Sequence, residues 1–400
     1  MLLSPAQTPE GQRGAVMILV VAGLVAMIAM AGLALDTAHA YLNKTRLQNA
    51  LDAAALSTAW VLNEGSDVVT AEAAGRATFA EHLEGELGDA NPAVDFEFSA
   101  TLLPFTPGAI EPDARYVRVR VGAFPMNIWL ARVLPGISDS QTVAGTAVSG
   151  PSPPLGTGEE GEVCDIAPML VCGDPGDTDC SDDACYGYAM NAQTETVLKT
   201  NAEASNDWEV GPGNFQLIQL DCGPGGDCVR EELAGGYSGC IDSDTVTTKP
   251  GNTVGPVAQG FNTRFGIYQG GMSSADAPPD VVTAEDIWHE QYQTRTEYGP
   301  HDEVWVEDGG IGVKQRRVMA IVFGDCSASV NGQGEVPVLG LGCFFMTRHT
   351  SHSGNTQYVY GQFISECEAA GTIAENPPGP GTGPALYKII LYKDPDSADT

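Results

Sequence analysis

The sequence predicts an α+β protein in which an N-terminal transmembrane helix continues into an amphipathic stalk helix. A small α+β module and a strand- and loop-rich, disulfide-bonded C-terminal domain follow. Three observations predict this class. An apolar run, Ala15 to Leu35, carries no charge, the apolar period changes from helical to alternating near Phe96, and all ten cysteines follow both features.

The run from Ala15 to Leu35 holds 21 residues without a charged or strongly hydrogen-bonding side chain. As a helix it reaches about 32 Å, which matches the roughly 30 Å hydrocarbon core of a bilayer. A core helix of a soluble protein keeps a polar face, so the run favours a membrane anchor over a buried soluble helix. Residues 1–14 are then a short stub before the anchor.

The stretch Thr37 to Ala40, TAHA, supports a second interpretation, because Ala38 and Ala40 form a small-x-small cleavage site for a secretory signal. The apolar run is longer than the roughly 7 to 15 residues of such a signal, and it leads directly into a further helical pattern. Both features favour a span that is retained.

The helical pattern continues beyond the span, with no Pro or Gly between Leu33 and Glu64, and Gly65 is expected to end it. A second helix is expected over Ala71 to Leu83, with Thr70 as its N-cap.

One face of this stalk helix carries apolar residues at three- and four-residue spacing, and its mixture of large and small side chains allows close helix approach. We expect this stripe to pack on a partner helix. An equally weighted alternative is that it covers the protein's own strands around Val117 to Val121. The stripe consists of Leu47, Ala50, Leu51, Ala54, Val61 and Leu62.

Strand alternation follows, first from Phe96 and then from Tyr116 to Val121. Residues 36–149 therefore form the stalk and the small α+β module. The Gly- and Pro-rich stretch 150–162 is a linker by composition. Residues 163–393 form the cysteine-containing domain, and 394–400 a tail.

Four elements are expected late in the chain. A helix is predicted over Val282 to Tyr292, with a capping box at Thr283 and Asp286. The strands Val318 to Phe323 and Val336 to Leu341 are separated by an Asn-Gly turn, which is typical of a hairpin. Residues 386–392 are predicted to form a final strand.

The cysteines lie in loops rich in Gly, Pro and Asp, which suits disulfides in an oxidising compartment and places the C-terminal part outside the cytoplasm. Zinc is the alternative, but no C-x-x-C pair is present. The pairing stays open, with the loop CGPGGDC a candidate local bridge. The disulfide candidates are Cys164, Cys172, Cys180, Cys185, Cys222, Cys228, Cys240, Cys326, Cys343 and Cys367.

The chain carries 52 acidic and 19 basic residues, for a formal charge of −33, and has no basic cluster beyond the span. Nucleic acid is excluded as a natural partner, because phosphate neutralisation needs clustered Lys and Arg. Docking on an anionic lipid surface through a polybasic patch is excluded for the same reason. The acidity is expected to keep an extracytoplasmic domain soluble.

Several partial motifs argue against catalysis. Asp325, Ser327 and Ser329 follow a strand in D-x-S-x-S order, but a second strand and not a helix is expected next, so a von Willebrand A metal site is disfavoured. His289 and Glu290 begin an H-E-x-x-H zinc motif that Gln293 breaks. We expect no enzyme activity and no cofactor.

An acidic loop, 174–183, has the ligand types of a structural calcium site but not the frame of an EF-hand. The carboxylates in question are Asp174, Asp177, Asp179, Asp182 and Asp183.

Ordered polar steps behind the span resemble the N-terminal segment of TadG-like proteins of the Tad, or Flp, pilus assembly machinery. In that family a hydrophobic span runs into an acid, a Tyr-Leu step, a basic-Leu-Gln step and an Asp-Ala-Ala-Ala-Leu helix. The matching residues here are Asp36, Tyr41, Leu42, Arg46, Leu47, Gln48, Asp52, Ala53, Ala54, Ala55 and Leu56.

The C-terminal part is similar to the partner domain of some Tad-like proteins. The segments that carry this second resemblance are Ala167 to Cys172, Gly213 to Phe215, Lys249 to Asn252, Gly255 to Arg264 and Arg316 to Cys343.

The resemblance implies a single-pass inner-membrane protein with a cytoplasmic N-terminus and a periplasmic C-terminal domain. Its implied partners are other pilus assembly proteins or pilin-like helices. Gly14 is not followed by the Glu of a type IV pilin precursor, so we do not expect trimming and polymerisation. The alternative function, from another class, is an envelope-tethered metal-dependent adhesin or hydrolase.

Overall fold

The computed structural model describes most of the chain between residues 13 and 396. The described ranges are 13–110, 113–130, 140–156, 161–178, 184–199, 214–219, 225–236, 239–241, 244–293, 312–328, 330–350, 352–353, 356–371 and 385–396.

The chain divides into two compact units that do not follow one another simply along the sequence. Unit 1 takes Met1–Leu62, Asp67–Gly150 and Leu391–Thr400, and unit 2 takes Asn63–Ser66 and Pro151–Ile390. Unit 2 is therefore an insertion between two parts of unit 1.

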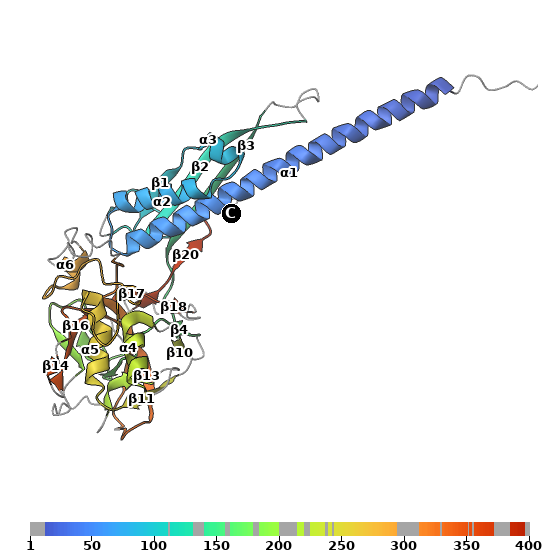
Figure 1. Cartoon of the computed structure of the whole chain (residues 1–400). Helices are drawn as coiled ribbons and strands as arrows, with labels where there is room; N and C mark the ends of the chain where they lie inside the picture. Colours follow the sequence, from blue (N-terminus) through green and yellow to red (C-terminus); the bar gives the residue numbers. More distant parts are fainter. Residues whose placement is uncertain are drawn as a thin grey trace, which may run out of the picture. The chain divides into compact units, whose positions relative to one another are not determined.

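Unit 1 is built on helix α1, Arg13–Asn63, which runs for 51 residues without a break (Figure 1). It is about 76 Å long. No proline or helix-ending glycine interrupts it until Gly65, whose φ of 85° favours glycine and stops the helix. The predicted continuity of the apolar run with the stalk helix, and the predicted stop, are confirmed.

Two shorter helices follow, α2 (Val68–His82) and α3 (Glu86–Ala90). The predicted start of α2 was wrong by three residues. Asp67 is the N-cap, and its carboxylate accepts a hydrogen bond from Thr70 N at 2.6 Å, so Thr70 lies inside the first turn.

The sheet of unit 1 has the order β1-β2-β3-β20. β1 and β2 pair antiparallel, as do β2 and β3, and the alternating valines Val117, Val119 and Val121 of β2 are buried. These strands confirm the predicted alternation. Their bounds are Asp95–Ser99 (β1), Tyr116–Asn127 (β2), Ser140–Pro151 (β3) and Ile389–Tyr392 (β20).

The other face of this sheet holds a cluster of ion pairs around Arg118. Its guanidinium lies 3.0 Å from Asp394 and 2.6 Å from Asp396, and it stacks over the ring of Phe105. Glu97 completes the cluster at 3.4 Å. Asp394 and Asp396, which lie in the stretch expected to be a tail, are therefore part of the folded unit 1.

Unit 2 is organised around a seven-stranded sheet with the path β5-β12-β13-β11-β9, to which β16 and β8 add beside β13. β12 and β13 form the predicted antiparallel hairpin, and β5 pairs with β12 in parallel. The bounds are Leu170–Gly173 (β5), Thr196–Lys199 (β8), Asn214–Ile218 (β9), Thr245–Pro250 (β11), Val318–Asp325 (β12), Glu335–Met346 (β13) and Val359–Ile364 (β16).

The two faces of this sheet bury two apolar clusters, as the alternation along β12 requires: Ala320 and Val322 belong to one, Met319, Ile321 and Phe323 to the other. Helices cover the second face, and residues 282–292 lie on the first. The helical elements of unit 2 are α4 (Gly226–Glu231), η3 (Glu232–Gly236), α5 (Val254–Asn262), η4 (Thr263–Phe265) and α6 (His289–Gln293).

Short strand pairs surround the main sheet of unit 2. β10 and β18 flank β4, β17 pairs with β19, β6 with β7, and β14 with β15. Their bounds are Val163–Cys164 (β4), Ala184–Cys185 (β6), Tyr188–Ala189 (β7), Cys240–Ile241 (β10), His352–Ser353 (β14), Thr356–Gln357 (β15), Glu366–Glu368 (β17), Ala370–Gly371 (β18) and Ala385–Tyr387 (β19).

Disulfides tie these strands together: Cys164–Cys240 joins β4 to β10, Cys172–Cys326 joins β5 to the end of β12, and Cys343–Cys367 joins β13 to β17. Cys185 and Cys228 are also disulfide-bonded, and none of the described cysteines is free. The predicted disulfide-bonded domain is confirmed. Cys180 and Cys222 lie outside the described residues, so the candidate bridge within CGPGGDC is not described.

Two predicted elements of unit 2 differ from the structure. Most of the helix expected over Val282 to Tyr292 is irregular, and only its end is helical, in α6. The guanidinium of Arg317 donates hydrogen bonds to the carbonyl oxygens of Val282 and Ala284 at 3.0 and 2.8 Å, oxygens that would accept from backbone amides in a helix. Asp286 has a φ of 56°, which is not helical.

The expected final strand splits at Lys388, and its two parts join different sheets, β19 with β17 and β20 with β3. The stretch expected to be a linker is partly ordered, because Ser152 N and Leu155 N donate to the carbonyls of Lys388 and Leu386.

Candidate functional site: the exposed half of helix α1 and its junction with the sheet

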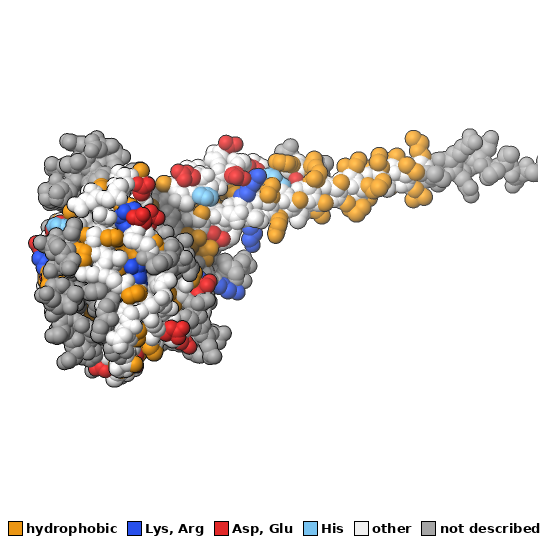
Figure 2. Space-filling model, turned by 60° about the horizontal axis from the view of Figure 1, so that its bottom comes forward, with side chains coloured by type: hydrophobic (Ala, Val, Ile, Leu, Met, Phe, Trp, Pro, Cys, Tyr) orange, Lys and Arg blue, Asp and Glu red, His pale blue; other side chains and the backbone are white. Residues whose placement is uncertain are grey.

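The N-terminal half of α1 exposes apolar side chains in every direction. From Met17 to Leu35 its large hydrophobic side chains are between 49% and 72% exposed. Figure 2 shows these side chains, in orange, along the free part of the helix. Within the part of the chain that the structure describes, α1 is the one helix long and apolar enough to cross a membrane.

The C-terminal half of the same helix is buried on one side. Leu47, Ala50, Leu51 and Ala54 are fully buried and Leu62 is 5% exposed, while Val61 is half-buried. This half carries the predicted packing stripe.

The sheet of unit 1 covers that stripe. A Cβ on Gly145 would lie 2.8 Å from Leu51 Cδ1, so the glycine lets β3 approach the helix closely. Gln48 Nε2 donates to the carbonyl of Thr146 at 2.9 Å, which ties the helix to the same strand.

Helix α2 approaches α1 as closely. A Cβ on Gly75 would lie 1.9 Å from Thr58 Oγ1 and 2.7 Å from the ring of Phe96. The expectation that the stripe receives a partner helix is therefore wrong, and the alternative, packing on the protein's own strands, is what the structure has. The amphipathic face had a sheet of the same chain to cover it.

The junction between the two halves is marked by Asp36, the first acid after the span. Its carboxylate is buried and accepts hydrogen bonds from two backbone amides just after β2, Trp129 N at 3.0 Å and Leu130 N at 3.0 and 3.2 Å. A Cβ on Gly32 would lie 3.1 Å from Leu130 Cβ. The end of β2 is thus held against the last turns of the apolar run.

Polar contacts one turn further on reinforce this junction. The His39 ring lies 4.2 Å from the Trp129 ring between centroids, and its Nε2 lies 3.3 Å from a carboxylate oxygen of Glu86. Asn43 is hydrogen-bonded to His39 at 3.0 Å, and Asn127 donates to Glu86. Helix α3, α1 and the end of β2 therefore meet at one polar cluster.

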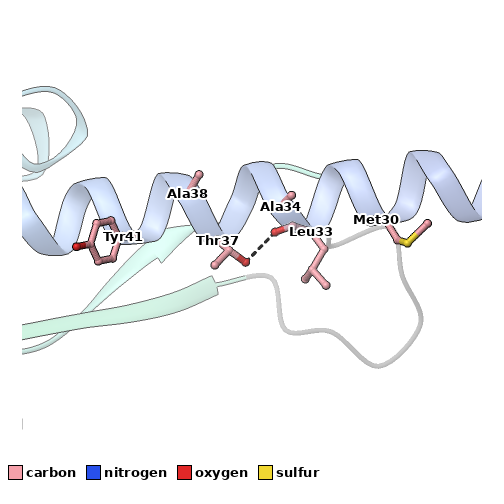
Figure 3. Close-up of a pocket in the computed structure, with 6 residues that line it drawn as sticks. All are labelled: Met30, Leu33, Ala34, Thr37, Ala38 and Tyr41. Atoms are coloured by element: carbon pink, nitrogen blue, oxygen red, sulfur yellow. Dashed lines mark hydrogen bonds between the residues drawn. The ribbon is translucent and has the colours of Figure 1, made fainter.

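A shallow groove runs along the opposite, exposed side of α1 at the same level. It is lined by Met30, Leu33, Ala34, Thr37, Ala38 and Tyr41 (Figure 3). Thr37 Oγ1 donates to the Leu33 carbonyl at 2.8 Å, so its hydroxyl is satisfied within the helix and the groove is almost wholly apolar. All the lining side chains come from one helix.

The polar residues that carry the family resemblance have structural roles in unit 1. Asp36 holds the end of β2, and Gln48 bridges β3 and Asp52, to which it donates at 2.8 Å. Burial raises the pKa of Asp52, and the Gln48 hydrogen bond partly offsets this shift. The sequence marks Met126 to Leu134 as an apolar stretch of the small α+β module, but it does not show that Trp129 and Leu130 within it contact Asp36.

The partial metal motifs are engaged in other contacts. Ser327 N donates to Asp325 in a turn that leads from β12 to β13, and Ser329 lies outside the described residues. His289 is half-buried against the Phe345 ring, and desolvation, together with the nearby Arg317 charge, lowers its pKa to about 4.

The acidic loop is described only in part. Asp174 accepts from Gly176 N and Asp177 from Gly187 N, both at 2.8 Å, while Asp179, Asp182 and Asp183 are outside the described residues. The one group of potential metal ligands found in the described residues is Glu162, Cys164 and Cys240, and its two sulfurs are joined in a disulfide.

Comparison with known families gives one match. Residues 14–61 match a family model described as putative Flp pilus-assembly TadE/G-like, and this range covers both halves of α1 almost completely. The N-terminal helix is thus TadE/G-like, as its polar steps predicted. No curated protein and no solved structure gives a significant match.

Proposed function

We propose, from the TadE/G-like character of its N-terminal helix, that this protein is a membrane-anchored, non-enzymatic component of Tad/Flp pilus assembly. The observation that carries the proposal is the contrast within α1: the matched helix is apolar all round in its first half and packed on its own sheet in its second. A helix that is apolar on every side needs lipid or other helices around it.

In this proposal the N-terminus lies in the cytoplasm and both units lie in the periplasm. The disulfides of unit 2 support its periplasmic location, because thiols of cytoplasmic proteins are kept reduced. Unit 1 lies at the membrane surface, and unit 2 supplies a binding surface for other envelope components.

The partner-facing part of α1 then lies in the membrane and not on the stalk. The stripe from Leu47 to Leu62 is already covered by β3 and α2. The exposed half includes small residues such as Gly23, where an added Cβ would meet no atom within 4 Å, and it remains accessible to transmembrane helices of other pilus components.

The absence of enzyme activity is part of the proposal. Its support is that the motifs with catalytic potential are used structurally, as His289 is in its aromatic contact and Asp325 in its turn. No described observation favours the adhesin or hydrolase alternative.

Two replacements of residues 15–35 test this function. A cleavable signal peptide in place of the span should export the units but release them from the membrane, and pilus assembly should be lost. A span of leucines of the same length should keep the protein anchored. If pili then form normally, the span is only an anchor. If they are lost while the protein accumulates, its sequence contacts a partner.

The native N-terminus is checked by mass spectrometry of the mature chain. A chain that retains Ala15 to Leu35 agrees with the proposal. A new N-terminus at Tyr41 would show that the TAHA site is cut and that the anchor does not persist.

A further inference from the structure

We infer that Trp129 and Leu130, directly after strand β2, form a membrane-contact site that inserts into the outer boundary of the lipid bilayer beside α1. The inference rests on the proposal that the apolar half of α1 is embedded in a membrane. It adds a second point of contact, so that unit 1 is fixed to the lipid surface and does not swing on a single helix.

The depth of Leu130 is set by the helix. Leu130 lies over Gly32, within the apolar run, and the neighbouring helix side chains Met30 and Leu33 are 63% and 49% exposed. Any lipid that surrounds those side chains also reaches Leu130, which is itself 47% exposed. A residue at this level cannot stay in water when the span is in place.

Trp129 lies at the polar boundary of the same contact. It is 56% exposed and its ring lies against that of His39, about 10 Å further along the helix than Gly32. Tyr41, also exposed, lies at this level on α1. Indole and phenol rings favour the membrane–water boundary, because one edge of each is apolar and the other can hydrogen-bond.

Asp36 removes the main obstacle to insertion. A strand end exposes backbone amides, and an unsatisfied amide in hydrocarbon costs several kcal/mol. Here the amides of Trp129 and Leu130 both donate to the Asp36 carboxylate. The acid therefore lets a non-helical segment enter the bilayer boundary with these two amides satisfied.

The composition of the chain favours lipid as the partner of this site, contacted by insertion of apolar side chains. With a net charge of −33 and no basic cluster beyond the span, the chain has no electrostatic means of holding an anionic surface. The contact surface is also continuous with the exposed apolar half of α1, which the proposed function places in lipid.

The test uses the full chain reconstituted into phosphatidylcholine vesicles and the tryptophan fluorescence of three proteins: wild type, Trp129→Phe and Trp60→Phe. Lipids brominated near the headgroup quench tryptophans at the boundary, and lipids brominated near the acyl terminus quench deeper ones. Trp60 is the matched control, because it is 45% exposed on the same helix but about 36 Å beyond Asp36.

We expect the shallow quencher to dim the wild type and Trp60→Phe to similar extents, and Trp129→Phe to lose most of that quenching. Equal quenching of all three proteins, or none, overturns the inference. Flotation of the vesicles separates the two claims. Protein that floats but shows no Trp129-dependent quenching contradicts only this inference, whereas protein that does not float contradicts the anchor as well.

Discussion

The two units of this protein achieve stability in different ways. Unit 1 contains no cysteine and is held by the long helix packed on a four-stranded sheet, with α1 and β3 in close approach at Gly145. Unit 2 contains all ten cysteines, and many of its strands are only two to four residues long. A long amphipathic helix buries enough apolar surface without covalent help, whereas short strands joined by Gly- and Pro-rich loops do not.

The insertion of unit 2 into unit 1 adds to this contrast. The chain leaves the sheet of unit 1 after β3 and returns to it as β20, so unit 1 is completed only by the last residues of the chain. Asp394 and Asp396, which pair with Arg118, belong to that return. Each unit is nevertheless compact in itself, so changes that affect one unit should be separable from changes that affect the other.

The largest effect is expected from Ala54→Glu. Ala54 of α1 is fully buried within unit 1. A carboxylate at this position would be desolvated without a partner, at a cost of more than about 3 kcal/mol. We expect the protein to disappear from immunoblots of membranes. Asn49→Glu is the control, because Asn49 is exposed on the same helix and its change should leave the amount normal. Normal accumulation of the Ala54 variant would disprove the described packing of unit 1.

The next largest effect is expected in unit 2 from the double change Cys343→Ser, Cys367→Ser. Removing this disulfide, whose cysteines are 24 residues apart, should destabilise unit 2 by about 3 kcal/mol. Hydrogen exchange followed by mass spectrometry should show faster exchange in β13 and β17, with β1, β2 and β3 unchanged. Equal acceleration in both units would mean that they unfold together and that the contrast between them is not real.

A smaller effect is expected at the junction in unit 1. Asp36→Ala leaves the amides of Trp129 and Leu130 without their acceptor, which should cost about 1–3 kcal/mol. Asp36→Asn retains one acceptor oxygen and should lose less. The measurement is hydrogen exchange of the peptide that ends β2, and an Ala variant that exchanges no faster than the Asn variant would argue against the role given to the carboxylate.

The smallest effect is a pH dependence confined to unit 2. Burial, with the charges of Glu368 and Asp280, raises the pKa of Glu64 to about 7, although Lys314 acts in the opposite direction. Because the unfolded chain ionises near its ordinary value of 4.5, this group favours folding fully below pH 4.5, and its contribution is lost as the pH rises to about 7.

Glu64→Gln should therefore melt at a higher temperature than wild type at pH 8, and the two curves should converge below pH 4.5. The difference should be at most a few degrees, because Glu64 keeps partial access to solvent. Calorimetry at both pH values measures it, and a difference that grows as the pH falls would show the opposite sign of the shift.

Local patterns in the sequence determined much of this fold. The uncharged run predicted the apolar helix, the unbroken pattern up to Gly65 predicted its continuation, and the hairpin of β12 and β13 followed from two apolar runs around an Asn-Gly turn. Each of these depends on residues close together in the chain, where periodicity and turn chemistry act directly. The disulfide-bonded state followed likewise from the number and placement of the cysteines.

Only the tertiary structure decided which surfaces meet. The stripe at Leu47 and Ala54 suited a partner helix as well as the chain's own sheet, because an amphipathic face specifies that it will be covered and not by what. The acceptor role of Asp36 depends on Trp129, which lies 93 positions along the chain, and the disulfide Cys172–Cys326 spans 154. Contacts over such separations are selected by the packing of the whole unit, which no local pattern encodes.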